Sequence, residues 1–218
     1  MGKLPRKHIL IVGLAALVFA LVGAIVGLLV ASSGSESSDS VRNLTLQPND
    51  LPPDFVLADE KLYNREELMA ELPAESQIAE AGLQEAIHVS YESPDDVPVV
   101  IDVFVYGYED EAAAETAHTY AVESDWMHLM LRRLDQERDP SSSRFSGSLA
   151  DGLGEYAYAM TGELEYDDSS MTVNAYLMRS GSARAQIVIS GESIFLAPDR
   201  VARNQYLRLE RPGAVAAP

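Results

Sequence analysis

The feature that most constrains this chain is an apolar stretch, 9–31, which contains no charged or strongly polar side chain. As a helix it is roughly 35 Å long, enough to cross a hydrocarbon core of about 30 Å. A cleaved signal peptide usually has a shorter apolar region, of about 7–15 residues. The small residues Ala31, Ser32 and Ser33 would permit cleavage, but the length favours an uncleaved transmembrane helix.

The charges that flank this stretch predict its orientation. Lys3, Arg6 and Lys7 lie in a basic tip, 1–8, whereas the residues just after the stretch carry acids and no base. Basic flanks stay on the cytoplasmic side of a membrane. We therefore expect a single-pass signal-anchor in the cell membrane, with a cytoplasmic N-terminus and an extracytoplasmic C-terminal part.

Small residues recur along the predicted transmembrane helix at spacings of three and four, which places them on one face: Gly13, Ala16, Ala20, Gly23 and Gly27. Such a face lets a second helix approach closely. One interpretation is a packed partner helix, for example in a homodimer. The other is that Gly is simply common in membrane helices.

The part of the chain beyond the stretch is strongly acidic. It holds all 34 acidic residues and all but three of the 16 Lys and Arg residues, giving a formal charge of −21. Such a surface repels phosphate backbones, so we exclude nucleic acid as a partner. It favours cations or a basic partner, but a solvated surface explains it equally well. The absence of Cys excludes disulfides, thiolate zinc sites, Cys nucleophiles and a lipid-modified N-terminal cysteine.

The acidic part divides into a Ser-rich tether at 32–43, a domain at 44–210 and a tail at 211–218. Alternation and turn residues predict strands at 55–62, 83–91, 97–108, 154–161, 171–179 and 183–190. Helical spacing and capping residues predict helices at 64–72, 76–81, 110–123, 126–136 and 196–208. The segment 139–148 reads as a polar loop.

Two details of the predicted strands indicate how they assemble. The strand 97–108 is apolar on both faces, as expected for a central strand covered on both sides. In the strand 83–91, Leu83 is expected on the same face as Ile87 and Val89. Adjacent strands joined by short turns give an antiparallel sheet, so the predicted fold class is α+β, an antiparallel sheet covered by helices and preceded by one transmembrane helix.

Several features resemble extracytoplasmic bacterial domains of uncharacterised function. They are the Asp50-Leu51-Pro52-Pro53-Asp54-Phe55 run, the strand and Ala-rich helix over 97–120, the Leu153-Gly154-Glu155 strand start, the Arg179-Ser180-Gly181 hairpin and the closing helix 201–209. In architecture the domain is similar to PsbP-like α/β/α sandwiches and to bacterial lipoproteins of that shape. The anchoring Cys of those lipoproteins is missing. The resemblance implies an accessory or ligand-binding domain and brings no catalytic residues.

The sequence holds no motif that predicts catalysis, a cofactor or a metal. Gly152-Leu153-Gly154 begins a GxGxxA match, but a polar loop precedes it and a strand follows, which is the wrong setting for a dinucleotide. A crowded acidic segment offers oxygen ligands for Ca²⁺ or is merely solvated: Glu163, Glu165, Asp167 and Asp168. The histidines His88, His118 and His128 are expected at surface or half-buried positions.

Five tyrosines lie on or beside the predicted strands: Tyr106, Tyr108, Tyr156, Tyr158 and Tyr176. Tyrosine offers apolar area with a polar tip. These side chains either line a ligand groove or form a sheet face beneath helices.

Together these patterns predict a membrane-anchored extracytoplasmic domain that binds a partner or ligand without catalysis, as a subunit of a membrane complex. The alternative is a tethered carrier that holds a lipid or another apolar molecule between sheet and helix.

Overall fold

The computed structural model describes residues 38–71, 76–95, 98–124, 141–154 and 156–211. The predicted transmembrane helix and the predicted helix 126–136 lie outside these ranges. In the described part, no helix has the length and apolar character needed to cross a membrane. The chain separates into two units, 1–39 and 40–218, and the account below concerns the second.

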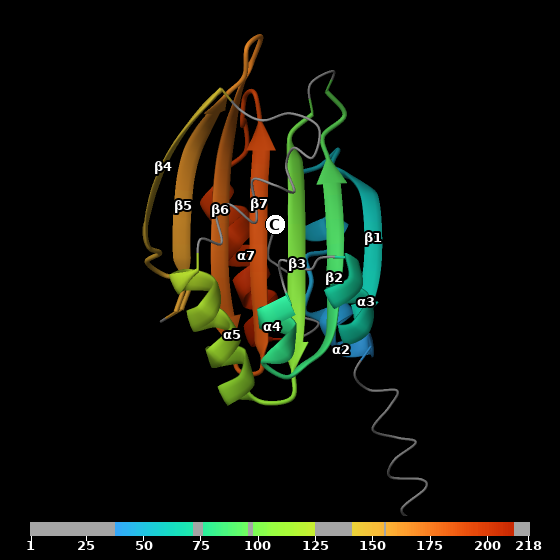
Figure 1. The fold of residues 1–218 in the computed structure, drawn as a ribbon. Coiled ribbons are helices and arrows are strands. Elements are labelled where there is room, and N and C mark those ends of the chain that lie inside the picture. Colours follow the sequence, from blue (N-terminus) through green and yellow to red (C-terminus); the bar gives the residue numbers. More distant parts are fainter. Residues whose placement is uncertain (1–37, 72–75, 96–97, 125–140, 155, 212–218) are drawn as a thin grey trace, which may run out of the picture. The chain divides into compact units, whose positions relative to one another are not determined.

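One antiparallel sheet of seven strands forms the centre of this unit (Figure 1). Its spatial order is β1-β2-β3-β7-β6-β5-β4. The strands are β1 Val56–Asn64, β2 Leu83–Glu92, β3 Val100–Tyr108, β4 Ser142–Leu149, β5 Tyr158–Glu165, β6 Ser170–Ser180 and β7 Ala183–Gly191. The α+β class predicted from the sequence is confirmed.

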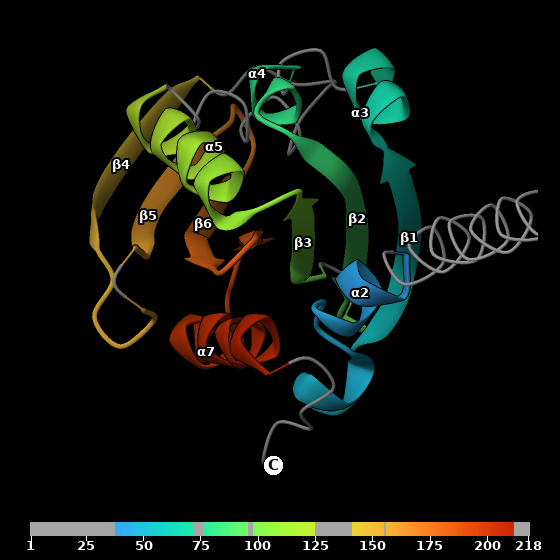
Figure 2. The same cartoon turned by 90° about the horizontal axis from the view of Figure 1, so that it is seen from below.

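Helices lie on both faces of the sheet (Figure 2). One face carries α3 Arg65–Glu71, α4 Ser76–Glu80 and α5 Glu111–Glu123. The other carries α2 Ser38–Asn43 and α7 Pro198–Glu210, with the short 3-10 turn η1 Pro48–Asp50 nearby. Below, these are called the α5 face and the α7 face.

A separate apolar cluster fills each face. On the α7 face, Ile101, Val103 and Val105 of β3 pack with residues of α2, β7 and α7. On the α5 face, Phe104 and Tyr106 of the same strand pack with residues of α3, α4 and α5. The strand β3 is thus covered on both sides, as its two apolar faces predict.

Local signals in the sequence set several element ends. At α3, the Glu67 amide donates to Asn64 Oδ1 over 2.9 Å, and the Asn64 amide donates to Glu67 Oε2 over 3.0 Å. This reciprocal capping box satisfies two amides at the helix start. At α5, Asp110 Oδ1 accepts from the Ala113 amide over 2.8 Å. Gly181, with φ of 54°, turns β6 into β7.

Three details differ from the sequence-based expectations. The predicted polar loop 139–148 contains β4, an edge strand with one neighbour and exposed side chains, so apolar alternation is absent. Leu83 packs on the α5 face, opposite Ile87 and Val89, because a register shift lies between Leu83 and Glu85. The end of the expected tether is helical, as α2, and its Val41 is fully buried.

Candidate functional site

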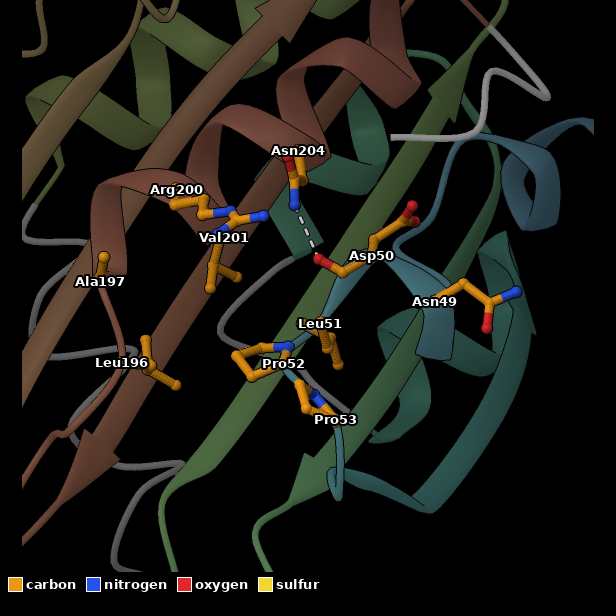
Figure 3. Close-up of a pocket in the computed structure, with 10 residues that line it drawn as sticks. All are labelled: Asn49, Asp50, Leu51, Pro52, Pro53, Leu196, Ala197, Arg200, Val201 and Asn204. Carbon is orange, nitrogen blue, oxygen red and sulfur yellow. Dashed lines mark hydrogen bonds between the residues drawn. The ribbon is translucent and has the colours of Figure 1, made fainter. Parts of the chain in front are cut away.

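A surface groove lies between the η1 segment and the start of α7 (Figure 3). Its volume is about 330 Å³. The residues that line it are Asn49, Asp50, Leu51, Pro52, Pro53, Leu196, Ala197, Arg200, Val201 and Asn204. Proline, leucine, valine and alanine side chains form most of the lining, and Arg200 extends across it toward Asn204 and Asp50.

Buried polar contacts join the two walls of the groove. Arg208 Nε and Nη2 donate to the two carboxylate oxygens of Asp50, over 2.8 and 3.0 Å. The Asp50 side chain is fully buried and that of Arg208 is 8% exposed. Asn204 Nδ2 donates to the Asp50 backbone carbonyl over 2.7 Å. A bidentate pair of this kind fixes orientation as well as distance, so the groove is preformed.

A second set of bonds holds the segment before η1 against the same helix. The buried side chain of Gln205 accepts from the Leu46 amide over 2.9 Å and donates to the Leu44 carbonyl over 2.6 Å. The Tyr91 hydroxyl donates to the Leu46 carbonyl over 2.8 Å, and burial raises the pKa of Tyr91 to about 12. Three backbone groups of an irregular segment, the Leu46 amide and the Leu44 and Leu46 carbonyls, therefore have partners away from water.

An adjoining hollow of about 350 Å³ shares Pro53 with the groove. Its residues are Pro53, Asp54, Phe55, Ser93, Pro94, Asp95, Ser193 and Phe195. The rings of Phe55 and Phe195 lie 6.2 Å apart, and Phe195 is 62% exposed. Val56, directly after Phe55, is 57% exposed. Exposed apolar side chains next to a hollow are typical of an interaction surface.

The groove offers binding groups but no acid or base for catalysis. The ten residues that line it include no Ser, Thr, Tyr, His, Lys or Glu. The carboxylate of its acid, Asp50, is buried against Arg208, and Arg200 is the other charged side chain among the ten. What remains is apolar area, amide groups and one exposed positive charge.

The five tyrosines, expected either to line a ligand groove or to form a sheet face beneath helices, do not gather in one place. Tyr106 and Tyr108 are buried on the α5 face, and Tyr158 packs against the same cluster. Tyr156 is 47% exposed, with its ring beneath Arg179. Tyr176 lies on the α7 face. Its hydroxyl donates to Asp199 Oδ1 over 2.7 Å, and burial, together with this bond, raises its pKa.

The other candidates from the sequence lie as follows. Glu163 and Glu165 belong to β5, and in the described residues no three His, Cys, Asp or Glu side chains are grouped to hold a metal. His88 Nε2 lies 2.9 Å from Asp102 Oδ1, and its ring stacks on Phe104 at 4.1 Å. His118, expected at a surface or half-buried position, is instead buried on α5, where α5 packs on the sheet. The small residues of the anchor, Gly13 to Gly27, lie outside the described ranges.

No protein-family model matches the chain, and no curated protein matches it either. The fold is similar to the crystal structure of the extracellular domain of PknH from Mycobacterium tuberculosis, with a TM-score of 0.56. The match covers 79% of this chain and 95% of that chain at 8% sequence identity. At a sequence identity this low, the match shows that the folds are similar and nothing more. It does not confirm the resemblance to PsbP-like sandwiches, which stays a prediction.

Proposed function

We propose that this chain is a membrane-anchored extracytoplasmic binding domain whose α7-face groove accepts an apolar segment of a partner or ligand, without catalysis. The observation that carries the proposal is the preformed groove beside the exposed Phe195. Apolar walls with a few fixed polar groups are typical of binding sites. The exposed Arg200 at the rim favours an occupant with a negative group beside its apolar part.

The proposed location rests on the sequence and on the fold. The apolar stretch 9–31 and its basic flank support a single-pass anchor with the domain on the extracytoplasmic side. The likeness to an extracellular domain is compatible with this location. The small-residue face from Gly13 to Gly27 supports a partner transmembrane helix or a homodimer. If Gly23→Leu and Gly27→Leu leave association unchanged in a membrane dimerisation assay, this part of the proposal fails.

The alternative, a carrier of an apolar molecule between sheet and helix, has less support. Both hollows lie at the surface, lined by exposed residues such as Pro53 and Phe195. The two faces of the sheet are occupied by packed apolar side chains. A molecule held in either hollow would remain partly in water.

The proposed role of the groove as a binding site is tested by a substitution that fills it. Ala197 lines the groove, is exposed, and its methyl group makes no capping bond at α7. We expect Ala197→Trp to occupy the groove while leaving the fold intact. Ala112→Trp is the matched control, because Ala112 is also exposed but lies on α5. Each full-length variant is purified from its native membrane, and co-purifying proteins and lipids are identified by mass spectrometry.

The expected result is a discrete species that co-purifies with the wild type and with Ala112→Trp and is lost from Ala197→Trp. A protein species supports the binding domain, whereas a stoichiometric lipid supports the carrier. Equal recovery with all three chains would show that the groove is not the binding site.

A further inference from the structure

Two arginines lie directly opposite each other inside the α5 face. The register pairs Arg179 of β6 with Arg184 of β7. Arg184 is 1% exposed and Arg179 is 6% exposed. Like charges directly across a sheet repel each other, and burial strengthens the repulsion.

The guanidinium of Arg184 has few contacts for a buried charge. It lies 4.7 Å above the Tyr106 ring, and its Nη2 donates to Gln186 Oε1 over a long 3.5 Å. Its Nε and Nη1 have no hydrogen-bond partner among the described residues. Buried donors without acceptors destabilise a fold, and charged ones do so most.

Among the residues that the structure describes, neighbouring groups add further polar atoms and little negative charge. Arg179 Nε also has no hydrogen-bond partner in the part of the chain that the structure describes. The Tyr108 hydroxyl lies beside Arg184, and the His118 ring, whose Nδ1 is unbonded, bonds the backbone of Tyr156. Arg179 Nη1 donates to Glu111 Oε1 over 3.2 Å, but Glu111 is 70% exposed. Burial, and then the charges of Arg184 and Arg179, lower the pKa of His118 to about 4. The cluster therefore carries an excess of positive charge.

We propose that Arg184, Arg179, His118 and Tyr108 form a site for one small oxyanion. One negative charge would balance the charge that Glu111 leaves uncompensated, and its oxygens would accept from the unpaired N–H groups of the two arginines. Phosphate and carboxylate share this chemistry. The site lies on the α5 face and Asp50, Arg200 and the α7 groove on the other, so it stands independently of the proposed function.

The test uses the full-length chain in detergent micelles. Thermal unfolding is measured with 20 mM inorganic phosphate, with 20 mM acetate, and with chloride alone at the same ionic strength. Arg184→Met removes the charge and keeps an unbranched side chain. Arg65→Met is the matched control, because Arg65 is exposed at the start of α3. We expect phosphate or acetate to raise the melting temperature of the wild type and of Arg65→Met by about 3–6 °C, for a Kd near 1 mM, and to leave Arg184→Met unchanged.

A second measurement decides the matter if Arg184→Met does not fold. The His118 ring is titrated by NMR in the wild type, with its signal assigned from His118→Gln. A bound anion should move the pKa of His118 upward from about 4, because it offsets the arginine charges. The proposal is overturned if neither anion changes the melting temperature or this pKa. It is also overturned if the anion stabilises Arg184→Met as much as the wild type.

Discussion

At the residue scale, the turn that separates the two hollows depends on one unusual backbone conformation. Asp54 has a φ of 84°, and among the residues that the structure describes it is the single non-glycine residue with a positive φ. This left-handed region disfavours a β-carbon and suits glycine. We expect Asp54→Gly to be more stable than Asp54→Ala by about 1 kcal/mol in urea unfolding. The same pair of substitutions at the exposed Asp95, whose φ is not positive, should show no such preference for glycine.

His118 gives a second prediction at this scale, through pH. Its pKa is about 4 in the folded chain, below the ordinary value of 6.5 that a histidine has when the chain is unfolded. Between these values the unfolded state binds more protons, so stability falls as pH decreases from 6.5 toward 4. In chloride buffer, wild type should lose roughly 2–3 kcal/mol more than His118→Gln between about pH 7 and about pH 4.5. Because protonation of carboxylates affects both chains, an equal loss in both would show that His118 is not buried in its neutral form.

At the element scale, α7 fixes the groove through Asp50 and Arg208. Removing one member of a buried ion pair leaves an uncompensated charge, at a cost of roughly 3–5 kcal/mol. We expect Arg208→Met to lose about that much in urea unfolding and Asp50→Asn in the same chain to recover part of it. Arg203→Met, at an exposed position on the same helix, should change stability by less than about 0.5 kcal/mol. If Arg208→Met left the free energy of unfolding unchanged, the Asp50–Arg208 pair would not be what holds the two walls of the groove together.

The elements themselves were largely predictable from local patterns, and the groove was not. Capping residues located α3, helical spacing located α5, alternation located β2, β6 and β7, and a run that is apolar on both faces located β3. These signals act over a few residues. The edge strand β4 was not predicted, because the side chains of an exposed strand lack apolar alternation. The pair of Asp50 with Arg208 joins residues 158 positions apart, and nothing in a single sequence links them. The sequence likewise did not predict that Arg179 and Arg184 face each other, because that depends on the register of the β6–β7 hairpin.

At the scale of the whole molecule, the two halves of the sheet are joined by the pairing of two strands that lie far apart in the sequence, β3 and β7. Hairpins join β2 to β3 and β6 to β7, and the two halves meet where β3 pairs with β7. The sequence predicted the hairpins and the covered strand β3, but not which strand would lie beside it, since strand order depends on packing between distant segments. The tyrosines illustrate the consequence: Tyr106 and Tyr176 lie on β3 and β6, yet on opposite faces.

The N-terminal boundary of the domain gives the last prediction. Val41 and Leu46 are fully buried, and Leu44 is 8% exposed. Gln205 and Tyr91 also bond the backbone of this segment. We expect a chain that begins at Ser40 to keep the melting temperature of the full-length protein, because the segment is retained.

A chain that begins at Pro48 loses three buried apolar side chains, each contributing about 1.5–3 kcal/mol. It also lacks the two backbone groups that bond the buried side chain of Gln205. Domains are stable by only about 5–15 kcal/mol, so this chain should lose most of its stability or fail to unfold cooperatively. Thermal and urea unfolding of the two truncated chains measure the difference. Equal stability would show that the segment between the predicted anchor and η1 is a tether along its whole length. The expected loss would make the last part of this segment the first element of the folded domain.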